Sequence, residues 1–93
     1  MQNDNFDATV KKFLRYYWGD LVEYALDLAQ LDDNERQAVE LCGRRRLTIE
    51  QAAEEAEVSV NTMQARWSKA RKRLARCWAG LEWVHTLADT VDD

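Results

Sequence analysis

Apolar residues follow one another at intervals of three and four along most of this 93-residue chain, and proline is absent. That interval is the spacing of one face of an α-helix, so these residues form stripes on successive helices. Glycine occurs only three times, which also favours long helices over the many turns of a small β-sandwich or barrel. With 46% hydrophobic residues, the chain has enough apolar surface for a core. The sequence predicts a single small all-α helical bundle.

The charge of the chain is unevenly distributed. A net charge of −4 argues against a protein held to nucleic acid by bulk positive charge. Residues 44–76, however, carry nine basic and four acidic residues, net +5, whereas the rest carries four basic and thirteen acidic residues, net −9. We therefore divide the chain into an N-terminal amphipathic helical arm (1–31), a central basic domain (32–79), and a C-terminal helical extension with an acidic tail (80–93).

The N-terminal arm carries an aromatic-rich apolar stripe. A kink or break is expected at Gly19, because glycine costs about 1 kcal/mol within a helix. The stripe either packs on the rest of the domain or contacts a second copy of the chain or another protein. Candidates for such a surface are Phe13, Tyr17, Trp18 and Tyr24. The whole stripe consists of Phe6, Val10, Phe13, Tyr17, Leu21, Tyr24, Leu28 and Leu31.

Capping residues divide the central domain into three helices. Asp32 to Asn34 start a helix over about 33–42, which Gly43 and the following arginines end. Thr48 and Gln51 form a capping box for a short second helix. Ser59 caps a longer third one, with a break near Gly80 and an acidic frayed tail after Ala88.

The second and third helices, joined by a short turn, form a helix-turn-helix pattern. Ala53 is small where the helices cross, Val58 fills the wedge between them, and Met63 and Trp67 hold the third helix against the core. The exposed start of the third helix predicts contacts with bases in the major groove, where Asn and Gln pair with adenine and Arg with guanine. The predicted base-contacting residues are Val60, Asn61, Gln64, Ala65 and Arg66.

The segment LTIEQAAEEAEVSVNTMQARWSKARKRL, from Leu47 to Leu74, resembles region 4 of bacterial sigma factors and the small phage or plasmid regulators built on the same module. The resemblance extends upstream to about Leu31. It implies double-stranded DNA as partner and places Thr62, Arg66 and Lys69 at bases or backbone. Because a single helix-turn-helix makes few phosphate contacts, RNA polymerase and a second copy of the chain, in a homodimer, are candidate partners. The full set of residues expected at the DNA backbone is Arg36, Arg44, Arg45, Arg46, Thr62, Lys69, Arg71, Lys72 and Arg73.

Three points in this assignment depend on packing. The arginines at 44–46 either clamp phosphate or form a solvated helix end. The cations at 71–76 either meet phosphate or pair with the acids of the N-terminal segment. Glu57 replaces the glycine that the family often has in the turn, so it must adopt a left-handed conformation or a different turn.

Other functions lack a supporting set of residues. Cys42, Cys77 and the single His85 form no zinc-ligand spacing or nucleophile arrangement, so we expect free thiols, no metal, no cofactor and no enzymatic activity. No apolar run reaches about 18 residues, which predicts a cytoplasmic protein without a membrane partner. The sequence predicts a sequence-specific DNA-binding transcription regulator. The alternative is a protein-interaction module of the same fold, docking on polymerase or another regulator or serving in phage packaging, with little DNA binding.

Overall fold

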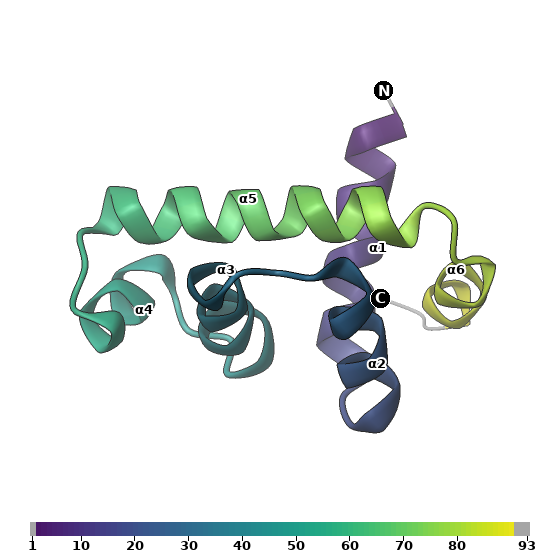
Figure 1. Cartoon of the computed structure of the whole chain (residues 1–93), viewed down its shortest axis with the longest axis horizontal. Coiled ribbons are helices and arrows are strands. Elements are labelled where there is room, and N and C mark those ends of the chain that lie inside the picture. The colour runs from purple at the N-terminus through teal and green to yellow at the C-terminus, as the bar shows by residue number, and fades with distance from the viewer. Residues whose placement is uncertain (1, 91–93) are drawn as a thin grey trace.

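A computed structural model describes residues 2–90, and the side chains of residues 8–90, as helices joined by short turns. The predicted all-α class is confirmed. Figure 1 shows one long helix, α5, running along the molecule, with α3 and α4 below one half of it and α2 below the other. The helices are α1 (Gln2–Tyr16), α2 (Asp20–Ala29), α3 (Asp33–Ala38), the π-helix η1 (Val39–Arg44), α4 (Ile49–Ala56), α5 (Val60–Trp78) and α6 (Glu82–Asp89).

Gly19 breaks the N-terminal segment into two helices, as the sequence predicts. Its φ of +125° lies in a region that glycine adopts without steric cost, and a new helix begins at the next residue. The break changes which face of the second helix is buried. Val22, Ala25 and Leu26 of α2 lie in the core, whereas the predicted stripe residues there are exposed. The prediction of one continuous stripe is therefore wrong beyond Gly19, because the turn resets the helical phase.

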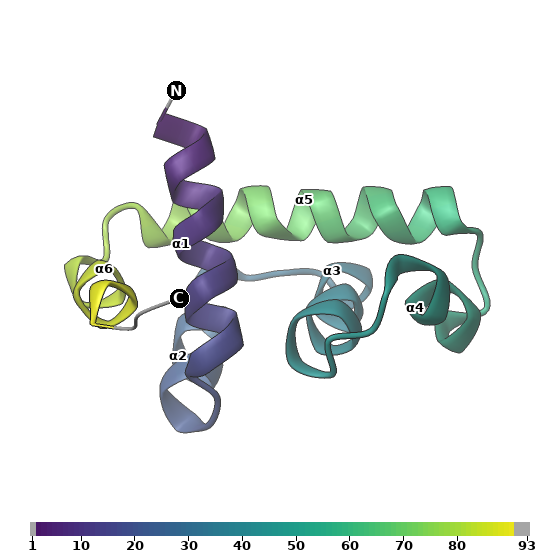
Figure 2. The ribbon, with the colours of Figure 1, turned by 180° about the vertical axis from the view of Figure 1, so that it is seen from behind.

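α1 packs within the chain. Val10, Phe13 and Leu14 are fully or almost fully buried in the larger of two core clusters, which joins α1, α2, α5 and α6. Figure 2 shows α1 crossing α5 toward the carboxyl end of α5. Packing on the rest of the chain, one of the two alternatives for this helix, is thus what the structure shows. The side chain of Phe6 lies outside the described residues.

Trp78 is the centre of the larger cluster. Its side chain is fully buried, its indole Nε1 donates a hydrogen bond of 2.9 Å to the carbonyl oxygen of Ala25, and its ring meets Phe13 edge-on at 5.1 Å between centroids. The second cluster joins α3, η1, α4 and the amino-terminal part of α5, and Trp67 packs against both clusters. α5 is therefore held along its length by both parts of the core.

The helix that begins at Asp33 does not end at Gly43. Asp32 caps it as predicted, accepting a hydrogen bond of 2.8 Å from the backbone N–H of Glu35, but after Ala38 it widens into η1. Gly43 is buried in this π-helix, and a Cβ there would lie 3.4 Å from Cη2 of Trp67. The glycine permits close packing rather than a left-handed cap. The left-handed residue is Arg46, with φ of +57°.

The carboxyl-terminal part of the structure turns back on α1. α5 ends before Gly80, as the sequence predicts, and α6 follows. Val84 of α6 lies in the larger cluster, and Ala88, one turn further along, is also buried. The hydroxyl of Tyr17 donates a hydrogen bond of 2.8 Å to the carbonyl oxygen of Leu87, which ties α6 to α1. The acidic tail expected after Ala88 lies mostly outside the described residues.

None of the helices among the described residues is long and apolar enough to cross a membrane.

Candidate nucleic-acid interface

Side-chain caps fix the start of both helices of the helix-turn-helix. The backbone N–H of Gln51 donates to Oγ1 of Thr48 at 3.1 Å, and the N–H of Thr48 donates to Oε1 of Gln51 at 3.0 Å, which completes the predicted capping box of α4. Ser59 caps α5 as predicted, because its Oγ accepts a hydrogen bond of 3.0 Å from the N–H of Thr62. These local bonds determine the residues at which α4 and α5 begin.

The crossing of α4 and α5 depends on small residues. Ala52 and Ala53 are buried against Met63, which is also fully buried. Val58, in the turn, packs on the same cluster and donates its backbone N–H to the carbonyl oxygen of Ala53 at 3.0 Å. The roles predicted for Ala53, Val58 and Met63 are therefore confirmed. A larger side chain at 53 would separate the helices, because protein interiors have no spare volume.

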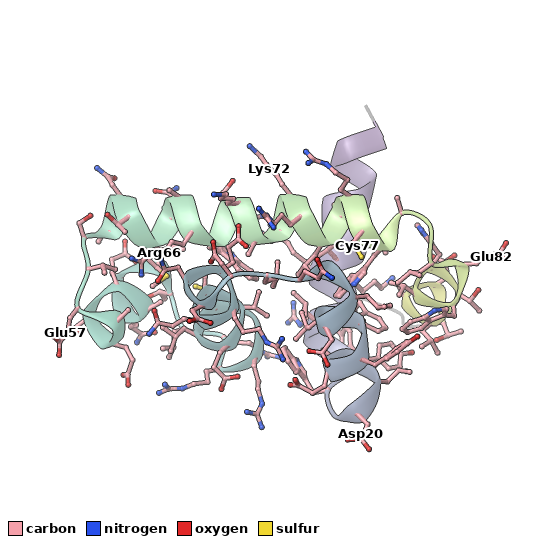
Figure 3. The ribbon with its side chains drawn as sticks, viewed as in Figure 1. Asp20, Glu57, Arg66, Lys72, Cys77 and Glu82 are labelled. Atoms are coloured by element: carbon pink, nitrogen blue, oxygen red, sulfur yellow. The ribbon has the colours of Figure 1, made fainter. Side chains whose placement is uncertain are left out.

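Glu57 has the left-handed conformation that its position requires. It ends α4 with φ of +59° and ψ of +45°, and its N–H bonds to the carbonyl oxygen of Glu54 at 3.2 Å. Figure 3 shows the carboxylate at the end of the molecule, pointing away from the bundle. A non-glycine residue here carries a steric cost, and its negative charge lies next to the start of α5.

Glu57→Gly should stabilise the protein by about 0.5–1 kcal/mol, because glycine adopts this conformation without strain. Thermal unfolding followed by circular dichroism should show a rise of roughly 2–8 °C in Tm. Glu54→Gly is the matched control: it removes a carboxylate from inside α4 and should destabilise the protein by about 1 kcal/mol. A fall in Tm for Glu57→Gly would contradict the left-handed turn.

The first turns of α5 face solvent. Val60 is 41% exposed, and Asn61, Gln64 and Ala65 are also exposed. Arg66 is half-buried. The structure thus brings together at one end of α5 the side chains that the sequence predicts as base contacts, with Arg66 less accessible than the other four.

A row of cations continues along the exposed face of α5. Lys69, Lys72 and Arg76 are exposed at intervals of three and four residues, so they share one side of the helix. Figure 3 shows Lys72 pointing away from the bundle. Arg76 belongs to the cations at 71–76 for which phosphate is one alternative, but it is not in the predicted set of backbone contacts; its spacing from Lys72 is the signal that would include it.

Two other cations of α5 make side-chain contacts within the chain. The guanidinium of Arg71 lies over the ring of Trp67, 5.3 Å from its centroid. Nε of Arg73 lies 3.2 Å from Oε2 of Glu35, whose side chain is only 2% exposed. The acid that pairs with Arg73 is thus a buried residue of α3. From the sequence, we expect such pairs only with acids of the N-terminal segment and of the start of α3.

The arginines outside α5 differ in their partners. Arg36 forms ion pairs with Glu23 and Asp27 of α2. Arg44 pairs with Glu40 at 3.2 Å, and Arg45 lies 3.6 Å from Glu55 of α4. Arg46 follows in its left-handed conformation and is exposed. These contacts are solvent-accessible, so each adds at most about 1 kcal/mol and can exchange with a phosphate.

The four residues predicted as a partner surface do not form one. Phe13 is fully buried in the core, so its assignment to a surface is corrected, because α1 uses this face for packing. Tyr17 and Trp18 are half-buried against the same cluster. Tyr24 is 58% exposed and shares the outer face of α2 with Leu21 and Leu28.

Both cysteines are free, as expected. Burial raises the pKa of the Cys42 thiol, and the nearby Arg71 guanidinium offsets part of that rise by favouring the thiolate. A raised pKa keeps this thiol protonated and poorly nucleophilic at neutral pH.

A capped short helix, a tight turn and a longer helix with an exposed polar start define the class of helix-turn-helix proteins. Within this class, the family model "Sigma-70, region 4" matches residues 27–74, which is just over half of the chain. The chain belongs to the sigma-70 region 4 family, whose domain is a helix-turn-helix module without enzymatic activity. Comparison with curated proteins and with solved structures gave no match.

Proposed function

We propose that this protein binds double-stranded DNA in a sequence-specific manner and regulates transcription, with the first turns of α5 in the major groove. The observation that carries this proposal is the exposed amide pair Asn61 and Gln64 at the start of α5, followed on the same helix by exposed cations. Such an arrangement separates base contacts from backbone contacts along one helix.

The exposed residues at the start of α5 suit direct reading of bases. Asn61 and Gln64 lie one turn apart, and each amide can donate to and accept from an adenine edge. Val60 and Ala65 can contact a thymine methyl group, and Arg66 is the candidate for guanine. Replacing one of these residues should therefore change preference at one base position.

We assign the phosphate contacts to the N-terminus of α5 and to lysine and arginine side chains. No acidic side chain occupies the first turn of α5, so its N–H groups and dipole favour a phosphate beside Thr62. Lys69 and Lys72 are the main cations that we assign to the backbone. Secondary backbone contacts are assigned to Arg36, Arg44, Arg45, Arg46, Arg71 and Arg73.

Selection of duplexes from a random pool tests the specificity. The wild-type protein should enrich a short common sequence, and Gln64→Ala should lose preference at one position, with about 1–3 kcal/mol of discrimination lost there. Lys69→Gln is the matched control, since it should weaken all duplexes alike and leave the enriched sequence unchanged. Enrichment of no sequence by the wild type would exclude specific recognition.

The outer face of α2 favours a second function, the binding of RNA polymerase as the protein partner. Leu21, Tyr24 and Leu28 are 45%, 58% and 41% exposed along one side of this helix, an apolar stripe that stays exposed among the described residues although Tyr24 stacks on Trp83. The carboxylates of Glu23 and Asp27 beside this stripe pair with Arg36, so the choice between RNA polymerase and a second copy of the chain is left to the experiment below.

Analytical ultracentrifugation distinguishes these partners. The protein alone should sediment as a monomer and should co-sediment with purified RNA polymerase, and Tyr24→Glu should weaken that association about tenfold or more by placing a charge in the apolar stripe. Gln64→Ala, which changes a proposed base contact on α5, should leave the association with RNA polymerase unchanged. A dimer that Tyr24→Glu dissociates would instead identify α2 as a contact between copies.

A further inference from the structure

A pocket of about 330 Å³ lies between α1, η1 and the middle of α5. This volume falls within the range of pockets that hold small molecules. α1 provides one wall and lies outside residues 27–74, so the pocket is formed only because this chain adds a helix to the family domain. Its lining residues are Lys11, Leu14, Arg15, Cys42, Gly43, Arg46 and Trp67.

The lining combines apolar surface with positive charge. Leu14, which is 1% exposed, and the half-buried ring of Trp67 form the apolar part of the lining, and Lys11, Arg15 and Arg46 bring cationic groups to the same space. Among the described residues that line the pocket, none is acidic. The guanidinium of Arg15 also lies over the ring of Tyr16, 5.8 Å from its centroid. An anion bound between Arg15 and Arg46 would be attracted by both guanidinium groups.

The backbone keeps the wall beside Trp67 open. Gly43 lies in η1, and a Cβ there would lie 3.4 Å from Cη2 of Trp67 and 3.5 Å from Cδ1 of Leu14. Single π-helical turns within α-helices are frequent at binding sites, because the extra residue changes the direction of neighbouring groups. The indole edge therefore borders the cavity with no side chain on Gly43 to cover it.

We infer that this pocket binds a small organic anion, a carboxylate or phosphate carried on a flat aromatic body. The aromatic body packs on Trp67 and Leu14, and the anionic group meets the guanidinium groups of Arg15 and Arg46, which suit planar or tetrahedral oxygen acceptors. Neither half of the lining is sufficient alone, so the ligand needs both a ring and a negative charge. Arg46 is also one of the secondary DNA-backbone contacts proposed above, but binding of the anion in this pocket can be measured without DNA.

Titration followed by NMR tests the inference with three probes. Phenyl phosphate should shift the indole N–H signal of Trp67, assigned from its loss in Trp67→Phe, with a Kd on the order of 1 mM, as expected for a ligand of this size. Benzyl alcohol lacks the charge and inorganic phosphate lacks the ring, so each should bind at least about fivefold more weakly. Equal binding of inorganic phosphate or benzyl alcohol would overturn the inference.

Variants of the two arginines locate the site. Arg15→Gln and Arg46→Gln should each weaken phenyl phosphate about fivefold, since each removes one charged partner. Arg44→Gln is the matched control, because Arg44 is exposed, pairs with Glu40 and does not line the pocket. The affinity of this variant for phenyl phosphate should equal that of the wild type. Both arginines of the pocket are exposed, so these variants should fold. Unchanged affinity in Arg15→Gln and Arg46→Gln would show that the phosphate binds elsewhere.

Discussion

Trp78→Ala is expected to destabilise the protein by about 3–5 kcal/mol, the usual cost of truncating a buried tryptophan. Trp78 is fully buried, contacts Phe13 of α1 and donates its indole N–H to Ala25 of α2. The variant loses this packing and leaves the carbonyl oxygen of Ala25 without that donor. For a domain of this size, Tm measured by circular dichroism should fall by roughly 15–30 °C.

Tyr24→Ala provides the control for this measurement. Tyr24 is 58% exposed, although its ring stacks on Trp83 at 6.3 Å, so its removal should cost about 1 kcal/mol or less. A comparable fall in Tm for both variants would contradict the position of Trp78 at the centre of the core.

The double charge reversal Lys69→Glu with Lys72→Glu is expected to weaken duplex binding about 100-fold or more at 50 mM salt. Both cations lie on the exposed face of α5, and each that contacts a phosphate releases about one counterion. Reversal removes two such contacts and places two carboxylates against the DNA backbone. The measurement is the anisotropy of a fluorescent duplex titrated with each protein.

Lys11→Glu with Lys12→Glu makes the same change in net charge on α1 and serves as the control. Its loss of affinity should be less than about tenfold, because neither lysine is among the proposed DNA contacts and charges that do not touch a phosphate are screened over about 10 Å. Equal losses in the two double variants would show that overall charge, rather than the face of α5, determines binding.

The local features of the helix-turn-helix could be predicted from the sequence because they depend on neighbouring residues. Thr48 with Gln51, and Ser59 with Thr62, form bonds across three positions, and these are the bonds in the structure. For Glu57 the sequence leaves two alternatives, a left-handed conformation or a different turn, and the structure has the first. Hydrogen bonds between residues three positions apart form in the same way whatever the distant packing is, so the sequence alone predicts them.

Features that depend on distant packing could not be predicted in the same way. The sequence predicts a break at Gly19. It does not predict which face of α2 is buried after the break, because that depends on how α2 packs on α5. Gly43 resembles a helix end in the sequence, but it lies inside η1 beside the ring of Trp67, a residue 24 positions away in the chain. The pairs of Arg36 with Asp27 and of Arg73 with Glu35 likewise depend on how the helices are placed relative to one another.

The salt dependence of duplex binding tests the central claim, that the exposed face of α5 binds DNA, most directly. The two main phosphate contacts, by Lys69 and Lys72, predict a slope of about −1.8 or steeper for the logarithm of affinity against the logarithm of salt concentration, or roughly a 25-fold loss or more between 50 and 300 mM. Lys69→Glu with Lys72→Glu should reduce the magnitude of that slope by about 2. An affinity that is the same at both salt concentrations, or a slope that the double variant leaves unchanged, would contradict the claim.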